Sequence, residues 1–138
     1  MTKISFSNDA ARAEAVAQQV VYRNIDRTTL LLENVGTSYS SFQIEVPFSQ
    51  GLLKRIVIYK ANSGDPATVA DIIVSESSTV SNLNKVAQYD SIDFTVDYLD
   101  SLEDIYYETQ TGYLYIHAKV NSGSENNLQV RLDLEKVN

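Results

Sequence analysis

The sequence contains no cysteine and no tryptophan, and its 138 residues include one histidine, two prolines and five glycines. Without cysteine the chain cannot form disulfides, thiol nucleophiles or zinc sites built on sulfur. The glycines stand singly, so the chain has no glycine-rich loop of the kind that holds a phosphate group. These absences exclude several common forms of catalytic and cofactor-binding chemistry.

Long apolar runs are also missing. No stretch has the length that crosses a bilayer, and residues 1–19 lack the apolar core of a secretory signal. We therefore expect a protein made and used without contact with a membrane, in a reducing cytoplasm or on a particle assembled there. The formal charge of −7 opposes binding to nucleic acid, because phosphate recognition needs a surplus of lysine and arginine on one face.

What the sequence does contain is short stretches in which apolar and polar residues alternate, the pattern of half-buried strands. A chain of this length is most simply one domain with a single core. The pattern predicts an all-β fold, an antiparallel β-sandwich of jelly-roll or related Greek-key type with about eight or nine short strands. The stretches that alternate are residues 20–25, 28–33, 42–48, 53–60, 69–75, 86–89, 92–98 and three segments within 104–137.

Turn and breaker residues separate these strands. Asp26 and Arg27 are expected to form a turn, and residues 62–66 and the polar stretch from Ser75 to Asn84 are expected to be loops. Pro47 lacks an amide donor, so its strand is expected to lie at a sheet edge or to end there.

Residues 1–19 differ from the rest, which divides the chain into an N-terminal segment (1–19) and a sandwich domain (20–138). Asn8 or Asp9 is suited to cap a short helix, although an extended arm is an equal reading of the segment. Its apolar side chains would bury little area alone, so we expect them to contact another subunit. The predicted interface residues are Ile4, Phe6, Ala13, Val16, Ala17 and Val20.

The last three strands are predicted to pair in sequence, with a hairpin turn at residues 109–112. This register places Tyr106 opposite Tyr115 and Asp104 opposite His117, and directs Leu114 and Ile116 to the core. The outward set then forms a possible contact face, consisting of Tyr106, Tyr113, Tyr115 and His117. Such a group is typical of protein interfaces, could stack on a sugar ring, or could simply be tyrosines that suit exposed strands.

His117 is the only histidine, and it has no cysteine to share a zinc ion with. As a general base it would need a nucleophile, and no serine lies in a glycine-flanked elbow. We therefore expect a surface histidine paired with an acid such as Asp104, or lying near Arg131, and a chain that is not an enzyme.

The acidic run from Asp90 to Asp104 could supply oxygen ligands to calcium, but its spacing matches no calcium loop. A solvated acidic surface is the better interpretation. No metal or cofactor is predicted.

The N-terminal segment and the strands SSFQIEVPF, LKRIVIYKA and GYLYIHAKV give the chain a style that resembles the small all-β decoration or cement proteins of tailed bacteriophages, which are auxiliary capsid proteins. The resemblance implies a structural protein of the virion surface that docks on a capsid lattice as a symmetric oligomer, with a trimer favoured, and clamps the shell with its N-terminal segment. The alternative is a carbohydrate-binding or receptor-binding sandwich that uses Tyr113 and Tyr115, although the absence of tryptophan weakens it.

Overall fold

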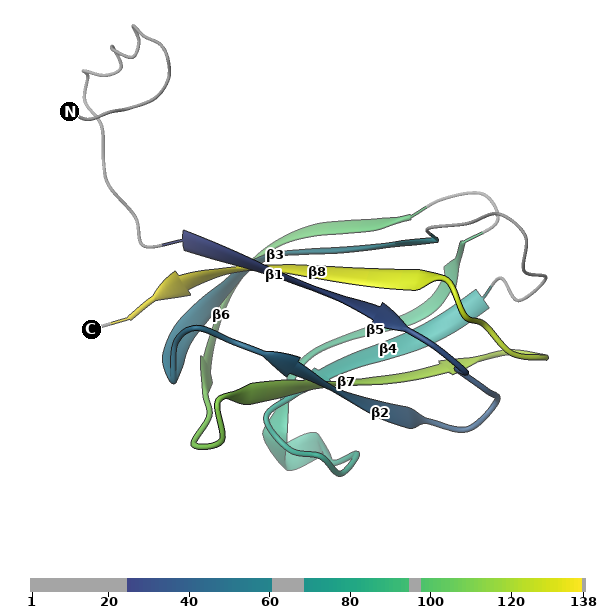
Figure 1. Ribbon diagram of the computed structural model, residues 1–138, viewed down its shortest axis with the longest axis horizontal. Coiled ribbons are helices and arrows are strands. Elements are labelled where there is room, and N and C mark those ends of the chain that lie inside the picture. Colours follow the sequence, from purple (N-terminus) through teal and green to yellow (C-terminus); the bar gives the residue numbers. More distant parts are fainter. Residues whose placement is uncertain (1–24, 61–68, 95–97, 138) are drawn as a thin grey trace, which may run out of the picture.

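The structure, a computed structural model, describes residues 25–60, 69–94 and 98–137. Eight strands in these residues form two sheets that pack face to face (Figure 1). The first sheet holds β1 (Ile25–Leu32), β8 (Leu128–Lys136), β3 (Gln50–Lys60) and β6 (Leu99–Glu108), in that order. The second holds β2 (Ser40–Glu45), β7 (Tyr113–Val120), β4 (Val69–Ser75) and β5 (Lys85–Asp93).

Every strand pair is antiparallel, and the chain crosses from one sheet to the other at each connection except that between β4 and β5. This order is the jelly-roll topology, two four-stranded sheets with Greek-key connections. The predicted antiparallel sandwich is therefore confirmed. Pro47 also behaves as expected, since β2 is an edge strand that ends at Glu45.

The core fills the layer between the sheets. Successive side chains of a strand face opposite sides, so the alternating apolar residues of every strand meet there. In β7, Leu114, Ile116, Ala118 and Val120 are all buried, as their alternation predicts. In β8 the buried set is Leu128, Val130, Leu132 and Leu134, again as predicted.

Tyr107 on β6 is the largest fully buried side chain, with 0% of its surface exposed. Its hydroxyl donates a hydrogen bond to the Phe48 carbonyl oxygen at 3.1 Å, which satisfies the polar end of the ring. Burial raises the pKa of this hydroxyl to about 12. The ring lies against Gly51, its cross-strand partner on β3, where a Cβ atom would be 2.7 Å from the ring.

The pairing of the last three strands differs from the prediction. β6 pairs with β3 in one sheet and β7 pairs with β2 and β4 in the other, so the predicted hairpin between them is wrong. Residues 109–112 carry the chain across the sandwich. The connection is fixed by Thr109, which is buried, donates its amide proton to the Ser49 carbonyl and its hydroxyl proton to the Tyr113 carbonyl.

Asp26 and Arg27 do not form the predicted turn, because they lie within β1. They are opposite Leu134 and Asp133 of β8, and Arg27 Nε donates to Asp133 Oδ1 at 2.9 Å. The two strands expected within 86–98 begin as one continuous strand, β5, and residues 95–97 lie outside the described part of the chain. The polar stretch after β4 contains the short 3₁₀ helix η1 (Asn82–Asn84), capped by the Ser81 hydroxyl.

Substitution of Gly51 by alanine tests the contact with Tyr107. We expect Gly51→Ala to lower the free energy of unfolding by about 1–3 kcal/mol, because the new methyl group overlaps the fully buried ring of Tyr107. Gly36→Ala is the matched control, since nothing lies within 4 Å of a Cβ atom there. Urea unfolding of the two variants measures the difference, and equal stabilities would contradict the proposed overlap.

Candidate functional site

His117 of β7 has 0% of its surface exposed, so the predicted surface histidine is wrong. Its Nδ1 atom lies 2.7 Å from the Ser41 hydroxyl of β2, and its Nε2 atom lies 3.0 Å from the Ser77 carbonyl oxygen. A carbonyl oxygen only accepts, so Nε2 carries a proton and donates it, and in the neutral ring Nδ1 accepts from Ser41. The ring thereby fastens the stretch after β4 over the outer side of β7.

Burial lowers the pKa of His117, and the hydrogen bond to the Ser77 carbonyl partly opposes this effect. The ring is therefore neutral at neutral pH. It does not face Asp104 or Arg131, both of which lie on strands of the other sheet.

The predicted contact face does not exist as one surface. Tyr115 is buried beside His117, while Tyr113 is partly buried at the start of β7. Tyr106 is exposed but belongs to β6, in the other sheet. The sequence predicts the alternation along β7 correctly but pairs β7 with β6, which lies in the other sheet. Nothing in the sequence of β7 indicates that residues 76–81 cover it.

The predicted N-terminal interface residues, Ile4, Phe6, Ala13, Val16, Ala17 and Val20, lie outside the described residues. The acidic run is dispersed: Asp100 and Asp104 pair with basic side chains of β3, and Glu103 turns inward. Glu103 accepts hydrogen bonds from the hydroxyl groups of Tyr89 at 2.6 Å and Ser101 at 2.7 Å. The bond from Tyr89 links the two sheets where β5 and β6 run close together. Burial, and then this carboxylate, raise the pKa of Tyr89.

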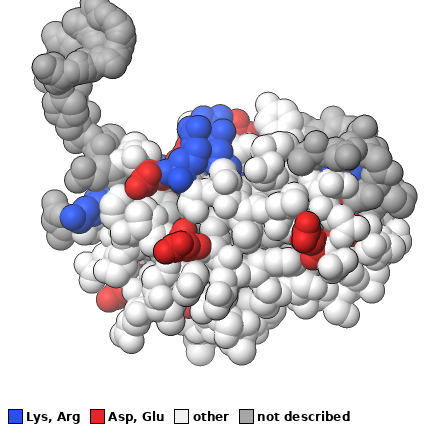
Figure 2. Space-filling view, viewed as in Figure 1, with Lys and Arg blue, Asp and Glu red and all other residues white. Residues whose placement is uncertain are grey.

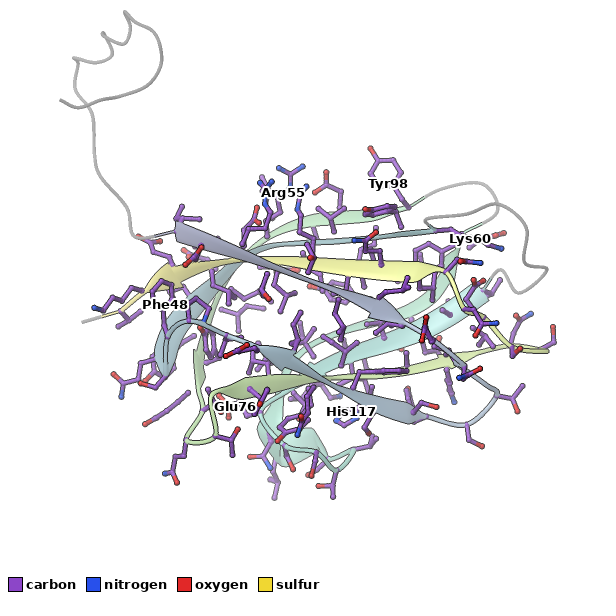
Figure 3. All side chains as sticks on the ribbon, in the orientation of Figure 1. Phe48, Arg55, Lys60, Glu76, Tyr98 and His117 are labelled. Atoms are coloured by element: carbon purple, nitrogen blue, oxygen red, sulfur yellow. The ribbon has the colours of Figure 1, made fainter. Side chains whose placement is uncertain are left out.

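The outer face of the β1-β8-β3-β6 sheet is the most distinctive surface of the described residues. Figure 3 places Arg55 and Tyr98 on this side of the sandwich and His117 on the opposite side. The register aligns its outward side chains in rows across the sheet. We call this surface the ion-pair face; it consists of Ile25, Arg27, Thr29, Leu31, Leu52, Lys54, Arg55, Val57, Tyr59, Tyr98, Asp100, Leu102, Asp104, Tyr106, Gln129, Arg131, Asp133 and Glu135.

Large apolar side chains gather at the ends and the β6 edge of the ion-pair face. Of the eight large hydrophobic residues that are exposed within the described chain, six belong to it: Ile25, Leu31, Tyr59, Tyr98, Leu102 and Tyr106. Leu102 has 80% of its surface exposed. The other two, Val80 and Leu83, belong to the stretch after β4.

The middle of the ion-pair face carries four basic and four acidic side chains, so its formal charge is zero in a chain of charge −7. Arg55 makes a bidentate contact with Asp100 at 2.8 and 2.6 Å, and Lys54 contacts Asp104 at 2.6 Å. The guanidinium group of Arg55 lowers the pKa of Asp100. Figure 2 shows basic and acidic side chains adjoining on this side of the molecule.

A β-bulge makes this charge pattern. The register of β3 shifts between Leu53 and Arg55, against both β6 and β8. Strict alternation would send either Lys54 or Arg55 into the core. The bulge turns both outward while Leu53 and Ile56 remain buried. Two consecutive basic residues between apolar ones are the only signal in the sequence for this feature.

Arg131 and Asp133 lie at the centre of the ion-pair face. The Oδ1 atom of Asp133 accepts a hydrogen bond from Arg27 Nε at 2.9 Å and lies 3.8 Å from Arg131 Nε. The Nε atom of Arg131 is buried and has no hydrogen-bond partner. The ion-pair face thus combines arginine and tyrosine side chains, the residue types that are enriched at contact surfaces between proteins.

The chain matches no protein-family model and no curated protein. A solved structure described as "Cyanophage Pam1 capsid asymmetric unit" is similar to it, with a TM-score of 0.42 and 9% sequence identity over 96% of this chain and 100% of that chain. A likeness this distant says nothing about what this chain binds. Within residues 25–60, 69–94 and 98–137, no helix is long and apolar enough to span a membrane.

The pH dependence of stability tests the position of His117. The unfolded chain takes up a proton near pH 6.5, whereas folded His117 resists protonation. The contribution of neutral His117 to the free energy of unfolding is therefore fully present above about pH 6.5, and it decreases as the pH falls toward the lower pKa of the folded state. His117→Gln removes this contribution, so the free energy of unfolding of the variant should depend less on pH in this range. Urea unfolding between about pH 5 and 8 compares the two proteins, and parallel curves would contradict the buried, neutral ring.

Proposed function

We propose that this chain is a non-enzymatic structural protein of a virion, which docks on the protein lattice of a capsid. In this proposal the ion-pair face and the N-terminal segment contact the lattice, and the rest of the sandwich remains at the virion surface. The protein acts as a symmetric oligomer, with a trimer as the expected form.

The observation that carries the proposal is the composition of the ion-pair face. Tyrosine and arginine are the residues that contribute most to contacts between proteins, and this face holds three exposed tyrosines and three arginines. The apolar side chains at its ends can be removed from water by a partner. Its basic and acidic groups already form pairs, so a partner does not need to neutralise an excess of either charge.

Charge favours this face over the rest of the surface as the side that meets a large assembly. Repeated copies of a chain with a charge of −7 repel one another when they gather on a lattice. A face with no net formal charge reduces that repulsion at the contact itself. The acidic remainder of the chain then points away from the lattice, where it keeps the particle surface soluble.

The N-terminal segment joins the domain at this same face. Ile25 begins β1 at one end of the ion-pair face, in the row that also holds Glu135, Leu52 and Tyr106. A segment of 24 residues precedes it and carries the apolar side chains Ile4 and Phe6. In this proposal the segment extends from the start of β1 across a neighbouring subunit.

The alternative use of Tyr113 and Tyr115 as a sugar-stacking pair has no support from their position. Tyr115 is buried beside His117, so its ring presents no open face to a ligand.

A pair of leucine substitutions tests the docking face. We expect Leu102→Glu to weaken binding to empty capsid shells that the unaltered protein binds by at least about tenfold, because it places a charge at an apolar contact. Leu83→Glu is the matched control, since Leu83 is 92% exposed and lies on η1, away from the ion-pair face. Co-sedimentation measures both variants. Equal binding of Leu102→Glu and the unaltered protein would exclude the ion-pair face as the docking surface.

Deletion of residues 1–19 tests the N-terminal segment separately. We expect the truncated protein to keep the thermal midpoint of the full chain and to lose shell binding, because the core formed by the described residues extends from Leu32 to Leu134. A large fall in the thermal midpoint would instead show that the segment belongs to the core.

Light scattering coupled to size exclusion measures the oligomeric state of the full-length protein, and a strict monomer at high concentration would contradict the symmetric assembly.

A further inference from the structure

A polar pocket lies at one end of the opposite sheet, on the side away from the ion-pair face. It encloses about 290 Å³ and is lined by Thr37, Val69, Asp71, Ser91, Lys119, Val120 and Asn121. Most of these residues lie on β4, β5 and β7 or directly follow them. The stretch of residues 76–81 contacts the neighbouring part of this sheet at His117 and Ser41.

Asp71 and Lys119 face each other across the pocket, on adjacent strands. The Oδ1 atom of Asp71 accepts a hydrogen bond from the Ser91 amide at 2.7 Å, which fixes the orientation of the carboxylate. Its Oδ2 atom is 3.9 Å from Lys119 Nζ, beyond hydrogen-bond length. A ligand hydroxyl group that bridges Asp71 and Lys119 can accept a hydrogen bond from the ammonium group and donate one to the carboxylate.

The position of both charged groups is set by neighbouring structure. Lys119 Nζ lies 4.8 Å from the centre of the Tyr39 ring, which holds the ammonium group by a cation–π contact. Ser91 has a φ angle of 56°, in the left-handed region that a serine rarely adopts. The register of β5 on β4 shifts beside it, and this bulge turns the Ser91 amide toward Asp71.

We propose that this pocket binds a neutral saccharide. A single ligand atom that bridges Asp71 and Lys119 has to donate and accept, which a sugar hydroxyl does and a carboxylate or an ammonium ion does not. Thr37, Ser91 and Asn121 offer further polar groups, and Val69 offers apolar surface for the C–H groups of a sugar ring. The volume suits a single sugar unit, either a free monosaccharide or the end of a longer glycan.

This inference goes beyond the proposed structural role. The pocket and the ion-pair face belong to different sheets, so a protein docked by one leaves the other open to solvent. A docked copy would therefore present the saccharide site outward. Failure of one proposal leaves the other intact, because the two surfaces share no residue.

The experiment is titration of the full-length protein with glucose, galactose, mannose and N-acetylglucosamine, followed by amide NMR, and a glycan array for terminal sugars of longer chains. We expect at least one sugar to shift the amide signals of Ser91 and Asn121. Asp71→Asn, which keeps the acceptor for the Ser91 amide, and Lys119→Met should each weaken that binding by at least about tenfold.

Asp104→Asn and Lys54→Met are the matched controls, since they make the same changes on the ion-pair face and should leave sugar binding unaltered. Binding by the array alone would identify a longer glycan, and binding of free sugars a monosaccharide. No signal change with any sugar up to tens of millimolar, together with an empty array, would overturn the proposal. Equal binding by the Asp71→Asn and Lys119→Met variants would also overturn it.

Discussion

A single apolar layer between two sheets is the constraint on which the rest of this structure depends. Each strand has to supply alternate side chains to that layer, so the outward residues are placed by what the inward ones require. The bulge in β3 shows this directly: Leu53 and Ile56 both stay buried, and Lys54 and Arg55 are consequently both turned outward. The pocket depends on the same requirement, because β5 returns Ile92 to a position opposite Ala70 only after the irregular backbone at Ser91.

The outer sides of the two sheets meet solvent differently. Over β7 a polar stretch of chain covers the strand and is fastened by His117, Ser41 and Ser77, so β7 is largely buried on both sides. Over β8 and β3 no described segment lies on the sheet, and long charged side chains cover it instead through mutual pairs. The covered side carries the polar pocket beside Asp71 and Lys119, and the uncovered side presents an extended surface. A small ligand suits the first and a protein suits the second.

Alternation in the sequence was sufficient to predict the fold class and most of the core. It identified the inward residues of β7 and β8 because these depend only on a period of two. It could not identify which strands are neighbours. A hairpin between β6 and β7 satisfies the same alternation as the true arrangement, and the difference lies in Thr109, whose buried hydrogen bonds carry the chain across the sandwich. The ion-pair face escaped prediction for the same reason, since its rows join β1, β8, β3 and β6, which are distant in the sequence.

The strand order has a consequence for how the chain reaches its folded state. Within the described residues, β1 forms its ladder only with β8, so the first described strand cannot pair until the last described strand has been made. Pairs so far apart in sequence close slowly, because most of the chain has to be ordered before they are formed. Ile25, Arg27 and Leu31 therefore take their places on the ion-pair face at the end of folding. A chain without β8 therefore cannot complete that surface.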